Sequence, residues 1–193
     1  MSEKYPSKKQ WGKGPWQDEP DELHWVDEAT GYQCHIIRCM PHSGHLNGYV
    51  AVPKTHPAWG ISYDGDTYAE HQERMEALWA ELRKTKGDIH KWQAFPEPTA
   101  FPGIGEAIEK IEVHGGLTYA GPSFHGIEGE WWFGFDCAHA FDLAPAMDAT
   151  MHLIYIEQNE TRKWDERQAV KARFGAQWQD KYRTIAYVRA ECK

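Results

Sequence analysis

The chain has 193 residues, a formal net charge of -8 and an apolar fraction of 41%. This length supports one domain whose core needs neither disulfides nor a structural metal, and the apolar fraction argues against disorder. The acidic charge argues against a general nucleic-acid backbone binder, which needs a face rich in Lys and Arg. No window approaches the roughly 18 consecutive apolar residues of a membrane span, so we expect no membrane partner.

The cysteines and the first residues both indicate an intracellular protein. Four cysteines are present without a CxxC pair, at positions 34, 39, 137 and 192. This spacing fits reduced thiols better than a disulfide framework or a four-cysteine zinc site. The first residues contain no apolar core of the signal-peptide type. We therefore expect the protein in the cytoplasm.

The pattern along the chain begins with a polar segment over 1–20, which predicts an N-terminal arm that Trp11 and Trp16 pin to the body. Short strands broken by turns follow at 23–26, 32–39 and 45–52, and they predict an antiparallel meander. Helical spacing over 67–86 predicts an amphipathic helix, and a long loop is expected over 88–105. Further strands are predicted at 108–113, 117–120 and 130–135, followed by a helix from about Ala138 and a mostly helical segment over 148–192.

These patterns predict an α+β fold in which flanking amphipathic helices pack on an antiparallel sheet. The expected domain organisation is an arm over 1–20 and a single domain over 21–193, with a loop and helix insertion around 66–105. The sequence contains no internal repeat.

The first motif that carries chemistry is VHGGLTY. Here His114 leaves a predicted strand directly into Gly115 and Gly116. Glycine has no Cβ, so such a turn can adopt positive φ and let a ligand approach the backbone closely. We expect Gly115, Gly116 and Tyr119 to contact a small-molecule ligand.

The second motif is WWFGFDCAHAFD, in which an apolar strand ends at Asp136, and His139 and Asp142 follow at steps of three. If the chain turns helical after Asp136, these polar side chains lie near one face. A carboxylate beside two imidazoles suits Zn²⁺ or a harder divalent ion, and a carboxylate that orients a His suits proton transfer. We therefore predict His114, Asp136 and His139 as catalytic residues and as ligands of a divalent metal, Zn²⁺ or Mn²⁺. The predicted ligand contacts from this motif are Trp131, Trp132 and Asp142.

A purely structural interpretation of the same residues stays open. Asp136 can cap the following helix, His139 can belong to its first turn, Asp142 can be a solvated charge, and His114 can be a satisfied core side chain. Cys137 is a weaker candidate for a nucleophile, because no neighbouring cation is evident that would lower its pKa.

Other polar residues could add to the site. His45 or His56 could complete it with His114, and nothing in the sequence chooses between them. Asp64 and Asp66 could bind a hard cation, but an Asp-Gly turn followed by a helix cap explains them more simply.

Several strings resemble a family of small uncharacterised proteins encoded by bacteriophages, prophages and bacteria. They are GPWQDEPDELHWVDEATGYQC, GHLNGYVAVPKTHP, VHGGLTYAGP, WWFGFDCAHAFD and YRTIAYVRAEC, and HGGLTYAGP and WWFGFDCAH are the most specific. The resemblance covers most of the chain except 66–105 and implies a phage-associated accessory protein, but it supplies no catalytic roles. It also leads us to expect Gly where this chain has Phe141.

Three functions are compatible with these residues. The first is a metal-assisted hydrolase of a small polar or nucleotide-like substrate, in which the metal lowers the pKa of a bound water. The alternative is a non-catalytic binding module for a small molecule or a protein, such as a host ligand that a phage protein sequesters. In that module the aromatic rings stack on the ligand, and the candidates are Trp59, Tyr119, Trp131 and Trp132. The third is a structural or interaction protein without a small-molecule pocket.

Overall fold

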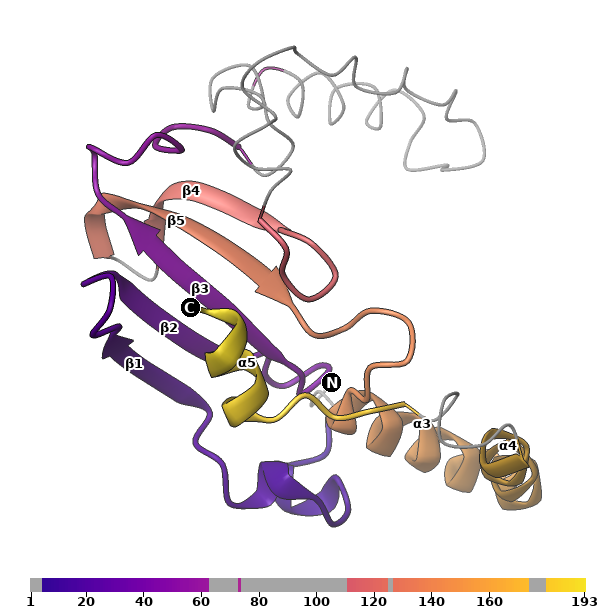
Figure 1. The fold of residues 1–193 in the computed structure, drawn as a ribbon. Helices are drawn as coiled ribbons and strands as arrows, with labels where there is room; N and C mark the ends of the chain where they lie inside the picture. Colours follow the sequence, from indigo (N-terminus) through magenta and orange to yellow (C-terminus); the bar gives the residue numbers. More distant parts are fainter. Residues whose placement is uncertain (1–4, 63–72, 74–110, 125–126, 174–179) are drawn as a thin grey trace. The chain divides into compact units, whose positions relative to one another are not determined.

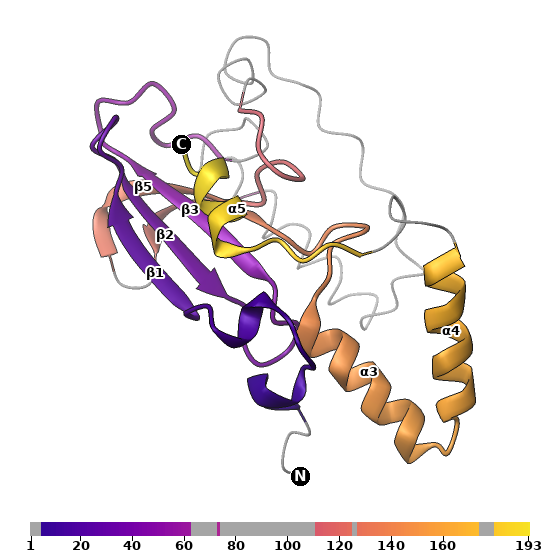
Figure 2. The ribbon, with the colours of Figure 1, turned by 60° about the horizontal axis from the view of Figure 1, so that its bottom comes forward.

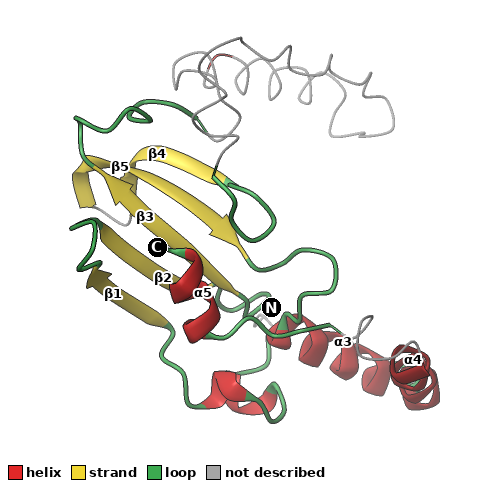
Figure 3. Cartoon of the chain, viewed as in Figure 1, coloured by secondary structure: helices red, strands yellow, loops and turns green. Residues whose placement is uncertain are grey.

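The computed structural model describes residues 5–62, 73, 111–124, 127–173 and 180–193, and Figures 1 and 3 show how their helices and strands are arranged. The elements in chain order are η1 (Lys8–Gln10), η2 (Pro15–Gln17), β1 (Glu22–Val26), β2 (Gln33–Arg38), β3 (Leu46–Val52), β4 (Tyr119–Phe124), β5 (Ile127–Asp136), α3 (Pro145–Glu157), α4 (Thr161–Arg173) and α5 (Ile185–Glu191). The helix expected over 67–86, the loop expected over 88–105, and Asp64 and Asp66 lie outside the described residues.

The strands form a five-stranded sheet with the order β1-β2-β3-β5-β4. The β1–β2 and β2–β3 pairs are antiparallel, and His35 in the middle strand of the three lies opposite His24 on one side and Tyr49 on the other. This arrangement confirms the predicted meander and, with the three α-helices of the described residues, the α+β fold. The expected strand at 108–113 is described only at 111–113, where no strand forms.

The chain forms two compact units. The first comprises Met1–Val50, Val113–Gly115 and Gly134–Lys193, and the second comprises Ala51–Glu112 and Gly116–Phe133. Strands β3 and β5 contribute residues to both units. The side-chain contacts described below each lie within one unit, and the predicted single domain over 21–193 stays a prediction.

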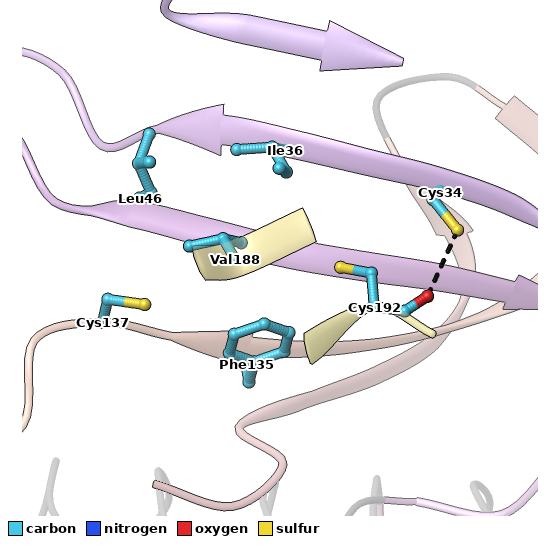
Figure 4. Close-up of a cluster of buried hydrophobic side chains, with 7 residues drawn as sticks. All are labelled: Cys34, Ile36, Leu46, Phe135, Cys137, Val188 and Cys192. Atoms are coloured by element: carbon cyan, nitrogen blue, oxygen red, sulfur yellow. Dashed lines mark hydrogen bonds between the residues drawn. The ribbon is translucent and has the colours of Figure 1, made fainter. Parts of the chain in front are cut away.

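The core of the first unit lies between α5 and the strands β2, β3 and β5. Figure 4 shows its seven buried residues, which are Cys34, Ile36, Leu46, Phe135, Cys137, Val188 and Cys192. Helix α5 approaches the sheet closely at Gly48, where an added Cβ would lie 2.6 Å from the Phe135 ring and 2.9 Å from a Val188 methyl group. The Cys34 thiol also donates a hydrogen bond to the Cys192 carbonyl over 3.6 Å, so this core fixes the C-terminal helix on the sheet.

The N-terminal segment is attached to the first unit by both apolar and charged contacts. Trp11 and Trp16 are buried against Ala146, as the sequence predicts. The guanidinium of Arg38 is buried and donates to Asp21 over 2.7 Å and to Glu19 over 3.3 Å. Because a buried guanidinium must be paired and hydrogen-bonded, these carboxylates fix the segment on β2.

Helix α3 begins at Pro145, and the expectation of a helix from about Ala138 is wrong. An Asp136 carboxylate oxygen accepts the Ala138 N–H over 3.0 Å, and Phe141 then adopts a φ of 72°. A left-handed residue cannot continue a right-handed helix, so a turn replaces the expected first helical turn. Pro145 occupies the first helical position, where its missing N–H is not needed.

Replacing Phe141 with Gly is expected to raise the free energy of unfolding by about 0.5–1 kcal/mol. A non-glycine residue in the left-handed region is strained, and this strain exceeds the extra backbone entropy that Gly loses on folding. The Phe141 side chain is exposed, so its removal should cost little packing. Thermal and urea unfolding of the variant measure the change, and a less stable Gly variant would show that the Phe141 ring makes a contact that matters.

Helices α3 and α4 form an antiparallel hairpin at one end of the first unit (Figure 2). Within the hairpin, the buried ring of Trp164 stacks on His152 at a centroid distance of 4.9 Å and meets Tyr155 at 5.7 Å. Among the described residues, every helix is too short or too polar to cross a membrane.

Candidate functional site

Both ring nitrogens of His114 are hydrogen-bonded. Its Nε2 lies 2.7 Å from an Asp142 carboxylate oxygen, and its Nδ1 lies 3.0 Å from the Tyr187 hydroxyl. Burial raises the pKa of the Tyr187 phenol, so this group stays protonated and can donate to Nδ1. The neutral imidazole then carries its proton on Nε2 and donates it to Asp142. His114 is therefore held in one ring orientation.

Asp142 is the centre of the polar network. Its side chain is only 1% exposed, one oxygen accepts from His114 and from the His139 backbone N–H at 3.1 Å, and the other accepts from Arg183 Nε at 2.8 Å. Burial works to raise the pKa of this carboxyl, but the hydrogen bonds from His114 and Arg183 outweigh burial and hold its pKa below the usual value. Asp142 is thus a buried carboxylate that stays ionised.

The C-terminal segment supplies three partners that the sequence analysis did not single out. Arg183 binds Asp142, Tyr187 binds the His114 ring, and a Glu191 carboxylate oxygen accepts the His114 backbone N–H over 2.8 Å. Tyr187 and Glu191 are spaced by four within α5, which places their side chains on one helical face, whereas Arg183 precedes the N-cap Thr184. The spacing of Tyr187 and Glu191 within YRTIAYVRAEC is the signal that could have found those two.

His139 and Asp136 form the more accessible part of the cluster. Their side chains are 33% and 30% exposed, and His139 Nε2 lies 3.9 Å from an Asp136 oxygen. The His139 ring centroid lies 5.5 Å from that of His114. The Nε2 atom itself is buried and makes no hydrogen bond to a described residue. The predicted residues therefore come together, through a turn rather than along a helix.

The His139 ring packs directly against the backbone of Gly115. Its φ is +68°, and a Cβ placed there would lie 1.8 Å from His139 Nε2. Any side chain at this position must displace the imidazole. The close neighbour of this glycine is an imidazole of the same chain, and the expected ligand contact of Gly115 stays a prediction.

His45 belongs to the same unit and is electrostatically coupled to Asp136, Asp142 and His139. Its Nδ1 lies 2.7 Å from the Ser43 hydroxyl. Burial lowers the pKa of His45, although the nearby Asp136 opposes this effect. Of the two histidines that the sequence left open, His45 is thus an electrostatic neighbour of the cluster, whereas His56 belongs to the second unit.

Cys137 lies beside the cluster without being activated by it. Burial, together with the negative charge of Asp142, raises the pKa of the Cys137 thiol to about 12. A thiol with such a pKa is not a nucleophile near neutral pH.

The other predicted ligand contacts lie in the second unit. They are Gly116, Tyr119, Trp131 and Trp132. Trp131 and Trp132 are buried, and Trp131 Nε1 donates to the Ile61 carbonyl over 3.0 Å. Buried indoles pack within the protein and do not present a face to a ligand. The stacking role expected of them in a binding module therefore has no support from their burial, and among the proposed stacking tryptophans only Trp59 is partly exposed.

The candidate metal ligands do not present a shared set of donor atoms in this arrangement. Both nitrogens of His114 already have hydrogen-bond partners, and an oxygen of Asp136 accepts the Ala138 N–H. In the part of the chain that the structure describes, no group of three or more His, Cys, Asp or Glu side chains is placed to hold a metal ion. Zn²⁺ or Mn²⁺ binding stays a prediction, which elemental analysis of the purified protein tests.

Comparison of the chain with protein-family models, with curated proteins and with solved structures gave no match. The resemblance to phage-encoded proteins stays a prediction as well.

Proposed function

We propose that the chain is a hydrolase of a small polar or nucleotide-like substrate that works by acid–base catalysis. In this proposal His139 and Asp136 are the catalytic residues, because they are the partly exposed members of the cluster. His114 is a positioning residue, held by Asp142 and Tyr187 and shielded from solvent.

The proposed chemistry uses two proton transfers. Nδ1 of His139 takes a proton from a water molecule as the water oxygen attacks the ester or phosphoester centre, while the buried Nε2 faces Asp136. The same imidazolium then protonates the leaving group from Nδ1. Asp136 stabilises the imidazolium across a separation that is 3.9 Å before substrate binds. Catalytic hydrogen bonds are often long in the free enzyme and shorten in its complex with substrate.

The observation that carries the proposal is that the partly exposed pair His139 and Asp136 lies next to the buried hydrogen-bond network of Asp142. The Asp142 carboxylate accepts three hydrogen bonds, from His114, the His139 backbone N–H and Arg183, and its side chain is 1% exposed. This network fixes the backbone from which the His139 side chain projects. Rigid support beneath a partly exposed imidazole and carboxylate is the arrangement that acid–base catalysis needs.

Asp136→Asn and His139→Ala are each expected to lower the hydrolysis rate by about 100-fold or more while changing the free energy of unfolding by less than about 1 kcal/mol. Both side chains are partly exposed and contribute little to packing. The rates should be measured on nitrophenyl esters of carboxylic acid, phosphate and phosphodiester type. The same preparations should be used for urea unfolding and for metal content.

Matched controls are His24→Ala on β1 and Asp165→Asn on α4, which change exposed residues of the same types in the same unit. Both should keep the wild-type rate. The proposal fails if the Asp136 and His139 variants keep that rate on every substrate that wild type hydrolyses, or if wild type hydrolyses none of them. A loss of stability without loss of rate would favour the turn-forming role of the Asp136 carboxylate.

A further inference from the structure

We propose that the hairpin of α3 and α4 is the surface through which two copies of this chain associate, with α3 of each copy lying along α4 of the other. We call it the hairpin surface. It consists of the exposed apolar residues Met147, Leu153, Ile154 and Ile156 on α3 and Ala169 and Val170 on α4.

Helix α3 is more apolar than a solvent-exposed helix should be. Met147 is 54% exposed and Ile156 is 48% exposed, and Leu153 and Ile154 are each 38% exposed. The first turn of α3 is buried against the body at Pro145 and Ala146, but the exposed residues extend to the last turn. Several large apolar side chains that gather on one exposed helix mark an interaction surface.

Helix α4 of the same copy does not cover this surface. It packs on α3 through Trp164, which contacts His152 and Tyr155. Leu153, Ile154 and Ile156 alternate with those contact residues along the helix and remain exposed. The N-terminal segment lies beside these residues, since Tyr5 and Pro6 line one hollow with Ile154, but it leaves Ile154 exposed.

Helix α4 has an outward strip that suits this role. Arg162, Glu166, Ala169, Val170 and Arg173 recur at the spacing of one helical face and are all exposed. Val170, toward the C-terminal end of the strip, is 50% exposed. Two small apolar side chains between charged ones allow a neighbouring helix to approach closely.

The charges of the two helices are complementary. Helix α3 has the acidic residues Asp148 and Glu157 and no Lys or Arg. Glu157 is exposed, whereas Asp148 shares the face of His152, which contacts α4 of the same copy. Helix α4 has five Lys and Arg residues and two acidic ones. Two α3 helices would therefore repel each other, whereas α3 attracts α4 of a second copy. In a dimer with a two-fold axis, α3 of the first copy contacts α4 of the second, and α3 of the second copy contacts α4 of the first. The α3–α4 contact is therefore formed twice.

The proposal is tested first by the mass in solution of the full chain, measured by light scattering at about 100 µM. Wild type should be a dimer, and Ile154→Asp should raise the dissociation constant at least about tenfold, because an aspartate cannot be buried unpaired in the contact. The matched control is Val26→Asp on β1, which changes an equally apolar side chain that is 56% exposed elsewhere in the same unit. That control should remain a dimer.

The pairing of α3 with α4 is tested by cross-linking in a Cys39→Ser background, since the three other native thiols are buried. Copies with Leu153→Cys are mixed with copies with Val170→Cys and treated with oxidised glutathione. The two protein thiols are oxidised to a disulfide, and the oxidised glutathione is reduced to two molecules of glutathione thiol. A mixed disulfide dimer is expected, and neither variant alone should cross-link to a comparable extent. The proposal is overturned if wild type is a monomer, including one that binds anionic vesicles through this surface. It is also overturned if Ile154→Asp leaves the dimer intact, or if Leu153→Cys cross-links only with itself.

Discussion

Gly115→Ala is expected to lower the proposed hydrolase activity by about 100-fold or more and the free energy of unfolding by about 1–2 kcal/mol. The added Cβ would lie 1.8 Å from His139 Nε2, so the imidazole must move away from its place beside Asp136. The ring is the end of a side chain and can move, which keeps the stability cost moderate. Function should suffer more than folding because the displaced group is the proposed acid and base.

Gly116→Ala is the control that separates displacement of the ring from backbone strain. Gly116 has a φ of +87°, and nothing lies within 4 Å of the position that its Cβ would take. The alanine there should cost a similar strain of about 1–2 kcal/mol and leave the rate near that of wild type. Steady-state rates and urea unfolding of the two variants give the comparison. If Gly115→Ala hydrolyses substrate as fast as Gly116→Ala, the position of the His139 ring does not matter for function.

Asp142→Asn is expected to have the largest effect on stability, a loss of about 3 kcal/mol in the free energy of unfolding. The amide keeps the shape of the carboxylate but removes the charge that pairs with Arg183, and its NH₂ group cannot accept from His114 or from the His139 backbone. Removing the Asp142 charge leaves Arg183, whose side chain is 25% exposed, with only partial compensation from solvent. Asp136→Asn, with a side chain 30% exposed, is the matched control and should lose much less.

The pH dependence of unfolding gives an independent measure of the Asp142 network. The pKa of Asp142 lies below its usual value of 3.8 in the folded protein, so its stabilising contribution is complete above that value and is lost as the pH falls through the lower folded pKa. Asp142→Asn should remove this acid-dependent part of the unfolding free energy. An unchanged acid dependence in the variant would mean that other carboxyl groups account for it.

The strands were predictable because they are short runs rich in aromatic and β-branched residues, bounded by turns. The strands expected at 23–26, 32–39 and 45–52 correspond to β1, β2 and β3, and EWWFGF lies within β5. The start of α3 was not predictable from helical spacing, because the decisive feature is the left-handed backbone of Phe141. Only the expectation of Gly at that position, which the resemblance gave, pointed toward such a turn.

The site was predictable in part. The two motifs do bring His114, Asp136, His139 and Asp142 together in one unit, although their roles stay predictions. The buried support was missed because Arg183, Tyr187 and Glu191 are distant in sequence, and pattern alone does not show that α5 packs beside His114. Trp131 and Trp132 were expected at a ligand because aromatic residues suit pockets, but they are buried as core.

Chemical rescue of His139→Ala by free imidazole is the most direct test of the claim that His139 transfers protons while the Asp142 network holds it in position. The alanine leaves an opening between Gly115 and Asp136 that a free imidazole can enter, because the missing ring rests on that glycine. Hydrolysis by the variant should rise at least about tenfold with added imidazole, and the same addition should leave wild type nearly unchanged. A variant that hydrolyses substrate as fast as wild type without imidazole, or one that imidazole does not accelerate, would contradict the proposed role of His139.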